Sequence, residues 1–355
     1  MTWKHVLAVD VDPWACRTYR ANMPGVPVVC ARVEADWIGH ELRETPVDVV
    51  LGGPPCQPYS AAGEGRGAAD ERCGFDAFVD VVSELRPRHA IAENVPGVLY
   101  ESHAESYLAY LRQLELIGYV VRYAELDAAD YGVPQNRRRV WAWAVRCDLA
   151  PLAPRWPEAT HAEPGECETM FGSLRPWVTC GDAIDAIGQP ARLPGASGYN
   201  GQRISGAGRP APTVIGSASP EFIRYRWSDA YRSCRPPAEL SRPSPTILAQ
   251  FAKGAPNGML AVDTAQGERV RRLTPDECLR LQSAPDDFAW PEGITKTAKY
   301  RIAGNGWACL MAHRMAEAVR AVDPEATTVV DLFAGGGLGA VGWSGRYWAW
   351  EGVAA

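Results

Sequence analysis

A cysteine on a proline-bounded turn is the first residue of this chain whose setting suggests chemistry. Cys56 stands in the run GGPPCQPYS, directly after an apolar stretch that reads as a strand over 47–51. Ligands of open α/β sheets bind at the carboxyl ends of such strands, and the prolines make the turn rigid. The glycine-rich run 61–67 that follows could close over a substrate. We therefore interpret Cys56 as a functional thiol, although a lone cysteine is more often an inert buried side chain.

Charged residues flank two further candidate strands. Glu93 ends the apolar run 90–93, so its carboxylate should project at the same edge of a sheet, although an acid there can equally be a helix cap or a solvated residue. The run QNRRR, residues 135–139, precedes a strand over 140–145. A charge run is usually a solvated face, but arginines at a strand edge also form an oxyanion or phosphate clamp.

A third candidate site is the apolar strand 327–333, which runs into the glycines of DLFAGGGLG. Such glycines admit a nucleotide-like cofactor at the carboxyl edge of a sheet, although a glycine-rich turn is often only structural. A doubly wound fold then needs a further strand that ends in an acid, and only sixteen residues follow Gly339. The run from Val6 to Asp10 supplies that strand, so we predict that the termini adjoin and that the chain is circularly permuted.

The elements that must position these residues alternate between strands and helices. Period-2 and β-branched runs predict strands over 5–10, 47–51, 90–93, 119–126 and 140–145. Apolar faces at helical spacing predict helices over 75–85, 107–117 and 307–322, and a capping box at 274–277 opens another. This alternation predicts an α/β fold with a doubly wound, mostly parallel sheet of Rossmann-like type.

A second, smaller domain is indicated where this regularity is lost. From about residue 151 the chain is rich in Pro, Gly, Ser and Arg with isolated aromatics, and it is too long for a loop. We predict a catalytic domain over 1–180, a small irregular domain over 181–292 and a second part of the catalytic domain over 293–355.

Composition restricts the class of protein. With 355 residues, 46% hydrophobic and 22% charged, the chain is an ordinary globular protein, and no run is long enough to span a membrane. Ten cysteines without a CxxC pair indicate reduced thiols and no zinc ribbon, and we expect an intracellular location. A net charge of −6 gives no global attraction to polyanions. Residues 200–250 nevertheless hold seven arginines against three carboxylates, which suits a local nucleic-acid surface or, alternatively, a solvated irregular domain.

Six segments together resemble the DNA cytosine C5 methyltransferases, which use S-adenosylmethionine. They are PPCQPYS, ENV, QNRRR, RRLTPDECLRLQ (271–282), YRIAGNG (300–306) and DLFAGGG. The resemblance covers most of the chain outside residues 150–240. The DLFAG motif comes first in the usual members and last here, in agreement with the predicted permutation.

The resemblance implies a DNA (cytosine-5-)-methyltransferase that transfers a methyl group from S-adenosylmethionine to cytosine. Cys56 would be the nucleophile that adds to C6, and Glu93 would hold N3 of the base. Arg139 would contact the O2 edge and support Glu93, with Arg137 nearby as electrostatic support. A target base in duplex DNA would be flipped out of the stack, and no metal is required.

The resemblance also assigns the cofactor residues. Phe333 would stack on the adenine, Gly335 and Gly337 would admit the methionine portion, Asp36 would contact the adenine amino group and Asn305 would brace the pocket. Asp10 would bind the ribose hydroxyls, with Glu351 as a rival for that role. The pair Gly306-Trp307 departs from the family, which commonly has Ala-Val there.

For the partner, the resemblance implies double-stranded DNA read by the small domain. The candidate contacts are Arg203, Arg209, Arg224, Arg226 and Arg232, with Thr246 at the end of the recognition region. We expect a prokaryotic, cytoplasmic monomer that serves modification beside a restriction endonuclease system. RNA cytosine as the substrate, or a catalytically silent DNA-binding paralogue, are the alternatives.

Overall fold

The computed structural model describes most of the chain, with gaps after Pro55 and through the arginine-rich region. The described residues are 3–55, 74–149, 151–169, 172–185, 243–244, 246–247, 259–264 and 267–350. Several residues singled out above lie outside them, namely Cys56, Glu351 and the five arginines 203, 209, 224, 226 and 232.

A sheet of seven strands forms the centre of the described molecule, in the order β2-β1-β13-β3-β4-β6-β5. The strands are β1 (Lys4–Asp10), β2 (Val28–Cys30), β3 (Val49–Gly52), β4 (His89–Asn94), β5 (Tyr119–Asp127), β6 (Arg138–Arg146) and β13 (Thr328–Leu332). The strands from β2 to β4 run parallel, and β6 pairs antiparallel with both β4 and β5. The mostly parallel α/β sheet predicted from the sequence is confirmed.

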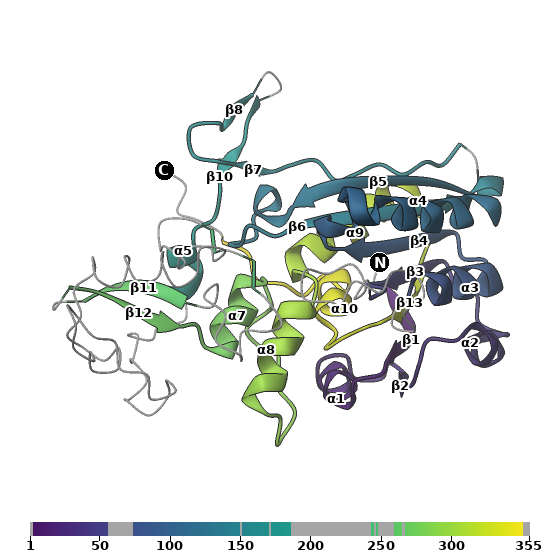
Figure 1. Cartoon of the computed structure of the whole chain (residues 1–355), viewed down its shortest axis with the longest axis horizontal. Coiled ribbons are helices and arrows are strands. Elements are labelled where there is room, and N and C mark those ends of the chain that lie inside the picture. The colour runs from purple at the N-terminus through teal and green to yellow at the C-terminus, as the bar shows by residue number, and fades with distance from the viewer. Residues whose placement is uncertain are drawn as a thin grey trace.

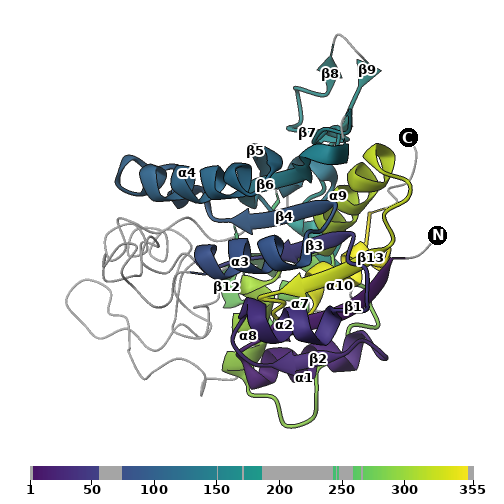
Figure 2. The ribbon, with the colours of Figure 1, turned by 90° about the vertical axis from the view of Figure 1, so that its right-hand side faces the viewer.

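Helices cover both faces of this sheet (Figure 1). The helices α2 (Ala35–Leu42), α3 (Phe75–Leu85) and α4 (Glu101–Leu116) share one buried apolar cluster with the strands, and Figure 2 shows them one below another. The helices α1 (Pro13–Asn22), α9 (Cys309–Val322) and α10 (Leu338–Trp343) form two further apolar clusters. These clusters contain the strand residues that point to the opposite face of the sheet. Burial from both sides explains why consecutive residues such as Val49 and Val50 are both fully enclosed.

The strand β13 lies between β1 and β3, although it is the last strand in the sequence. Leu332 pairs with Val9 on one side and with Gly52 on the other, and Gly52 pairs in turn with Ala92 of β4. These four paired residues lie side by side, so the residues that directly follow them form one row at the carboxyl edge of the sheet. In spatial order these residues are Asp10, Phe333, Gly53 and Glu93.

The two ends of the described chain meet on one side of this arrangement. The ring of Trp3, just before β1, lies 5.5 Å from that of Trp343 at the end of α10. The backbone N–H of Lys4 donates to the carbonyl of Thr327, which precedes β13. Residues near the beginning and near the end of the sequence thus build one continuous part of the sheet.

Smaller elements surround the sheet. The 3₁₀ turns are η3 (Pro96–Leu99), η4 (Ala128–Tyr131) and η5 (Cys147–Leu149), and the short strands are β7 (His161–Ala162), β8 (Glu168–Thr169), β9 (Gly172–Ser173) and β10 (Arg175–Pro176). The hairpin of β11 (Met259–Thr264) and β12 (Gly267–Arg272) projects away from the sheet (Figure 1). The helices α5 (Cys180–Asp185), α7 (Pro275–Leu281) and α8 (Lys296–Asn305) lie between this hairpin and the sheet. The domain boundaries at 180 and 292 stay a prediction.

Two helices illustrate what local sequence could and could not predict. The capping box of α7 is confirmed, because the Thr274 hydroxyl accepts from the backbone N–H of Glu277, whose carboxylate accepts from the N–H of Thr274. The helix α4 begins at Glu101, six residues before the predicted start, because the amphipathic pattern is visible only from Tyr107 onward. In the part of the chain that the structure describes, no helix is long and apolar enough to cross a bilayer.

Candidate active site

A buried ion pair occupies one end of the row of strand ends. The Arg139 Nε lies 2.8 Å from Glu93 Oε1, and the two side chains are only 11% and 10% exposed. Glu93 is on β4 and Arg139 enters β6, so antiparallel pairing of these strands brings the two charges together. Because both side chains are largely buried, removal of either one would leave an uncompensated buried charge, which is costly. The pair offers a fixed carboxylate and guanidinium to any ligand at this edge.

The turn that leads to Cys56 is anchored beside this pair. Asn94, the residue after Glu93, donates from Nδ2 to the carbonyl of Pro54 over 3.0 Å. On the other side the backbone N–H of Gly74 donates to the carbonyl of Pro55 over 3.0 Å. Both prolines are therefore held at the carboxyl edge, where the described segment ends. The sequence did not single out Asn94 for this task, although it stands beside Glu93 in the ENV motif.

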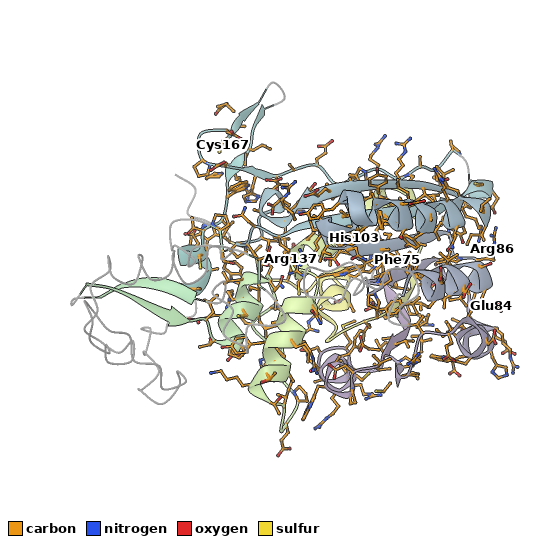
Figure 3. The ribbon with its side chains drawn as sticks, in the orientation of Figure 1. Phe75, Glu84, Arg86, His103, Arg137 and Cys167 are labelled. Carbon is orange, nitrogen blue, oxygen red and sulfur yellow. The ribbon has the colours of Figure 1, made fainter. Side chains whose placement is uncertain are left out.

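Arg137 has a different environment from Arg139. Its Nη2 donates to the carbonyls of Gly304 and Gly306 over 3.2 and 2.9 Å, and Nη1 donates to that of Ile247 over 3.5 Å. Burial first, and then the charge of Arg139, lower the pKa of Arg137 to about 9. Figure 3 shows Arg137 near the middle of the molecule, where it joins the β5–β6 connection to the end of α8.

Arg137 thereby fixes the backbone on both sides of Asn305. Asn305 is the last residue of α8 and is exposed, and the carbonyls on either side of it both accept from Arg137. The same connection also holds Thr246, whose hydroxyl donates to the carbonyl of Asn136 over 2.7 Å. The described residues 246–247 are thus attached to the β5–β6 connection beside the Glu93–Arg139 pair.

The glycine turn after β13 forms the other end of the row. The residues Phe333, Gly335 and Gly337 all have positive φ angles, of 53°, 55° and 84°. The N–H of Gly335 donates to Asp10 Oδ2 over 2.8 Å, and the N–H of Asp12 donates to Asp10 Oδ1 over 2.8 Å. Burial raises the pKa of Asp10, while these two backbone donors act in the opposite direction. Asp10 therefore ties the end of β1 to the turn that follows β13.

The two glycines of this turn serve different physical needs. A Cβ at Gly335 would meet nothing within 4 Å, so the backbone there faces open space. A Cβ at Gly337 would lie 3.0 Å from the ring of Tyr19, so that glycine permits close approach of α1. Gly335 is the one of the two whose backbone is accessible to a ligand.

Phe333 connects the glycine turn to the turn of Pro54 and Pro55. A Cβ at Gly74 would lie 3.0 Å from the Phe333 Cζ and 2.5 Å from the Pro55 Cδ, so ring and proline meet at the start of α3. The aromatic ring, the proline turn and the Glu93–Arg139 pair are consequently parts of one site.

Asp331 is a buried carboxyl group that the sequence analysis did not consider. It lies on β13 beneath the glycine turn, and burial, together with the nearby Asp10 carboxylate, raises its pKa to about 8. The Tyr19 hydroxyl faces it and favours its charged form. An acid inside an otherwise apolar strand is the signal that could have marked it.

Asp36 is exposed on α2 and lines a cavity of about 550 Å³ between α2 and α3, together with Asp80, Ser83 and Glu84. Among the described side chains, no group of three or more His, Cys, Asp or Glu is placed to hold a metal ion.

These features bring a glycine turn and a buried acid–arginine pair to the carboxyl edge of a Rossmann-like sheet, where they form one candidate active site. Comparison with known proteins names the family. A profile described as C-5 cytosine-specific DNA methylase matches residues 1–321. The chain therefore belongs to the C-5 cytosine-specific DNA methylase family.

Named relatives agree with this assignment, and solved structures share the fold. The chain is 33% identical over 312 residues to the type II methyltransferase M.AplI of Arthrospira platensis, covering 86% of this chain and 76% of the relative. It is 29% identical over 320 residues to the type II methyltransferase M1.HphI of Haemophilus parahaemolyticus, covering 88% and 80%. A prophage-encoded DNA modification methyltransferase of E. coli has a TM-score of 0.58 at 20% identity, covering 90% and 93% of the two chains. The S. pombe Dnmt2 methyltransferase has a TM-score of 0.56 at 16% identity, covering 88% and 90%. The last two likenesses concern the fold.

Proposed function

We propose that this protein transfers a methyl group from S-adenosylmethionine to C5 of a cytosine that is flipped out of a specific duplex DNA sequence. The observation that carries the proposal is the row of Asp10, Phe333, Gly53 and Glu93, with Arg139 bound to Glu93. Membership of the C-5 cytosine-specific DNA methylase family supports cytosine in DNA as the substrate. The names of the relatives support a type II modification role beside a restriction enzyme.

In this proposal Cys56 supplies the nucleophile. Carbon C5 of cytosine is a weak nucleophile, and addition of the Cys56 thiolate to C6 makes C5 electron-rich. Cys56 follows Pro55 directly in the chain, and the anchoring of Pro54 and Pro55 by Asn94 and Gly74 supports a rigid approach. When the C5 proton is later lost, the Cys56–C6 bond breaks and 5-methylcytosine is released.

Glu93 and Arg139 stabilise the charge that this addition creates. Addition at C6 places negative charge on the ring, which is tolerated when N3 is protonated or strongly hydrogen bonded. Glu93 would hold that proton at N3, and Arg139 would orient the carboxyl group and donate to O2 of the base. Their contact at 2.8 Å, between side chains that are about nine-tenths buried, supports this division of tasks.

The glycine turn fits a nucleotide-type methyl donor. The open backbone at Gly335, the Phe333 ring and the Asp10 carboxylate could receive its amino-acid, adenine and ribose parts, respectively. When bound, S-adenosylmethionine supplies an electrophilic methyl group. Gly337, Asp36 and Asn305 are the further candidates on this side, and Arg137 supports Asn305 through its flanking carbonyls.

We further propose that the chain is a circularly permuted member of the family. Its support is the position of β13, last in sequence but between β1 and β3 in the sheet, and the end of the family match at residue 321, before β13. The contacts between Trp3 and Trp343 are consistent with this order.

Bisulfite sequencing of DNA from cells that express the protein tests the proposed activity. We expect protected cytosines within one recurrent sequence, and none with Cys56→Ser. In purified protein Glu93→Gln should lower the methylation rate by about 10²-fold or more, since general acid–base groups contribute that much. The matched control is Glu125→Gln, because Glu125 forms a pair with Arg138, which is 67% exposed, on the neighbouring strands.

Two further measurements distinguish this proposal from its alternatives, which are RNA cytosine as the substrate and a catalytically silent DNA-binding paralogue. DNA that contains 5-fluorocytosine should form a covalent adduct with the parent protein and none with Cys56→Ser. Absence of both protected cytosines and adduct would refute the proposal, and methylation of RNA alone would replace the DNA substrate.

A further inference from the structure

Two cysteine side chains meet beside the Asp10 end of the row. Cys16 is buried on α1, and its Sγ donates to the carbonyl of Asp10 over 3.3 Å and to that of Val29 over 3.9 Å. Cys30 is the exposed last residue of β2, and its Sγ donates to the carbonyl of Val11 over 3.7 Å. The two thiols therefore hold consecutive carbonyls of the β1–α1 connection.

The fold directs the two side chains toward each other. Cys30 pairs with Asp10 in the sheet and stands two residues after Val28, so both Val28 and Cys30 point to the same face. Val28 packs in the cluster that contains Tyr19 of α1, which identifies that face as the one covered by α1. Cys16 reaches the same face from α1, because its Sγ lies 3.3 Å from the carbonyl oxygen of Asp10, which is the sheet partner of Cys30.

The pair has unequal reactivity. Burial first, and then the neighbouring Cys30, raise the pKa of the Cys16 thiol to about 12, so Cys16 is not the thiol that reacts first with an oxidant. Cys30 is open to solvent and can be reached by a small oxidant. An accessible thiol beside a second, enclosed thiol is the arrangement of an attacking and a resolving cysteine.

We propose that Cys16 and Cys30 are a peroxide-sensitive dithiol that closes to a disulfide and thereby weakens binding at the glycine turn. The Cys30 sulfur attacks hydrogen peroxide, the O–O bond breaks, and Cys30 sulfenic acid and water form. The Cys16 sulfur then attacks the sulfenic sulfur, and the S–O bond breaks as water leaves with the thiol proton. Two thiols are oxidised by two electrons and one peroxide is reduced to two waters.

The effect on binding follows from what the thiols hold. In the disulfide neither sulfur can donate to the carbonyls of Asp10 or Val11, and the new bond ties α1 to β2. Asp10 in turn holds the N–H of Gly335, so a shift of this connection reaches the open backbone of the glycine turn. This part of the inference rests on the proposed function, whereas formation of the disulfide does not.

Peptide mapping of the peroxide-treated full-length protein tests the chemistry. After alkylation and digestion without reductant, we expect a peptide pair that carries Cys16 and Cys30, two hydrogen atoms lighter than the reduced peptides and restored by dithiothreitol. Cys30→Ser and Cys16→Ser should each abolish it, and Cys147→Ser, at an exposed cysteine of another element, should leave it unchanged. Oxidation of Cys30 without a bond to Cys16 would overturn the proposal.

Calorimetry with S-adenosylhomocysteine tests the consequence. The oxidised parent should bind about tenfold more weakly than the reduced parent, a usual size for coupling between sites. Cys30→Ser should bind equally before and after peroxide. A disulfide that leaves the affinity unchanged would overturn the effect on binding. A reduced parent that does not bind at all would refute the proposed function while the mapped disulfide still stood.

Discussion

The carboxyl groups of Asp10 and Asp331 lie close together but differ in how strongly their charged forms are stabilised. Asp10 receives two backbone N–H groups, from Gly335 and Asp12, which stabilise its charge. Asp331 is buried below it beside Tyr19, and its pKa is raised to about 8, chiefly by burial. One acid of the pair is therefore suited to meet a ligand, and the other is suited to stay neutral inside the sheet.

The raised pKa of Asp331 predicts a pH-dependent stability. A folded-state pKa of about 8, above the ordinary 3.8, means that the folded protein holds this proton more tightly than the unfolded chain. The resulting stability is fully present below about pH 4 and is lost as pH rises through 8. Between pH 7 and 9 the group should reduce the free energy of unfolding by about 1 kcal/mol.

Asp331→Asn removes this titration and should flatten the pH dependence by that amount. Urea unfolding at pH 7 and pH 9 measures it, with Asp80→Asn, at an exposed carboxyl group of α3, as the control. An unaltered pH slope in Asp331→Asn would contradict the prediction.

Among the elements, the segment between α8 and α9 joins the two halves of the site through one indole. Trp307 is 8% exposed, and its ring contacts that of Trp141 on β6 edge-on at 4.8 Å. A Cβ at Gly53 would lie 3.6 Å from its Nε1, and a Cβ at Gly339 would lie 3.1 Å from its Cε3. The indole therefore supports the turn after β3, the strand that pairs with Glu93, and α10.

Removal of this indole should be costly. Trp307→Ala leaves a cavity where three elements meet, and we expect the free energy of unfolding to fall by about 3–5 kcal/mol. Trp350→Ala, at a tryptophan that is 39% exposed, should cost less than about 1 kcal/mol. Urea unfolding followed by far-UV circular dichroism compares the two, and equal losses would show that Trp307 does not brace the site.

At the scale of the whole molecule, the sheet does not depend on where the chain begins. The strand β13 is bonded to β1 and β3 along its length, and the first described residue packs against the end of α10. The connection from α9 to β13 is a turn at 323–327, away from the carboxyl edge. A chain in which β13 and α10 precede β1 could therefore make the same contacts.

We predict that such a rearranged chain folds. Joining residue 355 to residue 1 by a flexible linker and opening the chain after Glu325 should change the free energy of unfolding by less than about 2 kcal/mol, because loop closure depends weakly on length. The control opens the chain between Ile91 and Ala92 inside β4, where a central strand would be interrupted and folding should fail. Similar urea midpoints for both rearrangements would contradict this account.

The sequence by itself determined six of the seven strands of the central sheet, four helices and the family of the protein. Strand periodicity, the Thr274 capping box and the glycines after Leu332 are local patterns, and their meaning depends only on residues a few positions away. A doubly wound fold needs a further strand beside the one that precedes the glycines, and the sequence indicated Val6–Asp10 for that place. The pairing of β1 with β13 confirms that the two are neighbours. The weak amphipathic character of α8 explains why that helix was not predicted.

Only the tertiary structure decided which side chains share a site and in what state. The burial of Arg137 against the carbonyls around Asn305, the bracing by Trp307 and the approach of Cys16 to the strand of Cys30 have no local signature. Asp331 stands out in its strand as an acid, but its raised pKa depends on burial beside Asp10. Each depends on strand order, register and helix placement, which bring together residues that are mostly far apart in the chain. Local sequence constrains backbone conformation, whereas burial and partner choice are properties of the assembled layers.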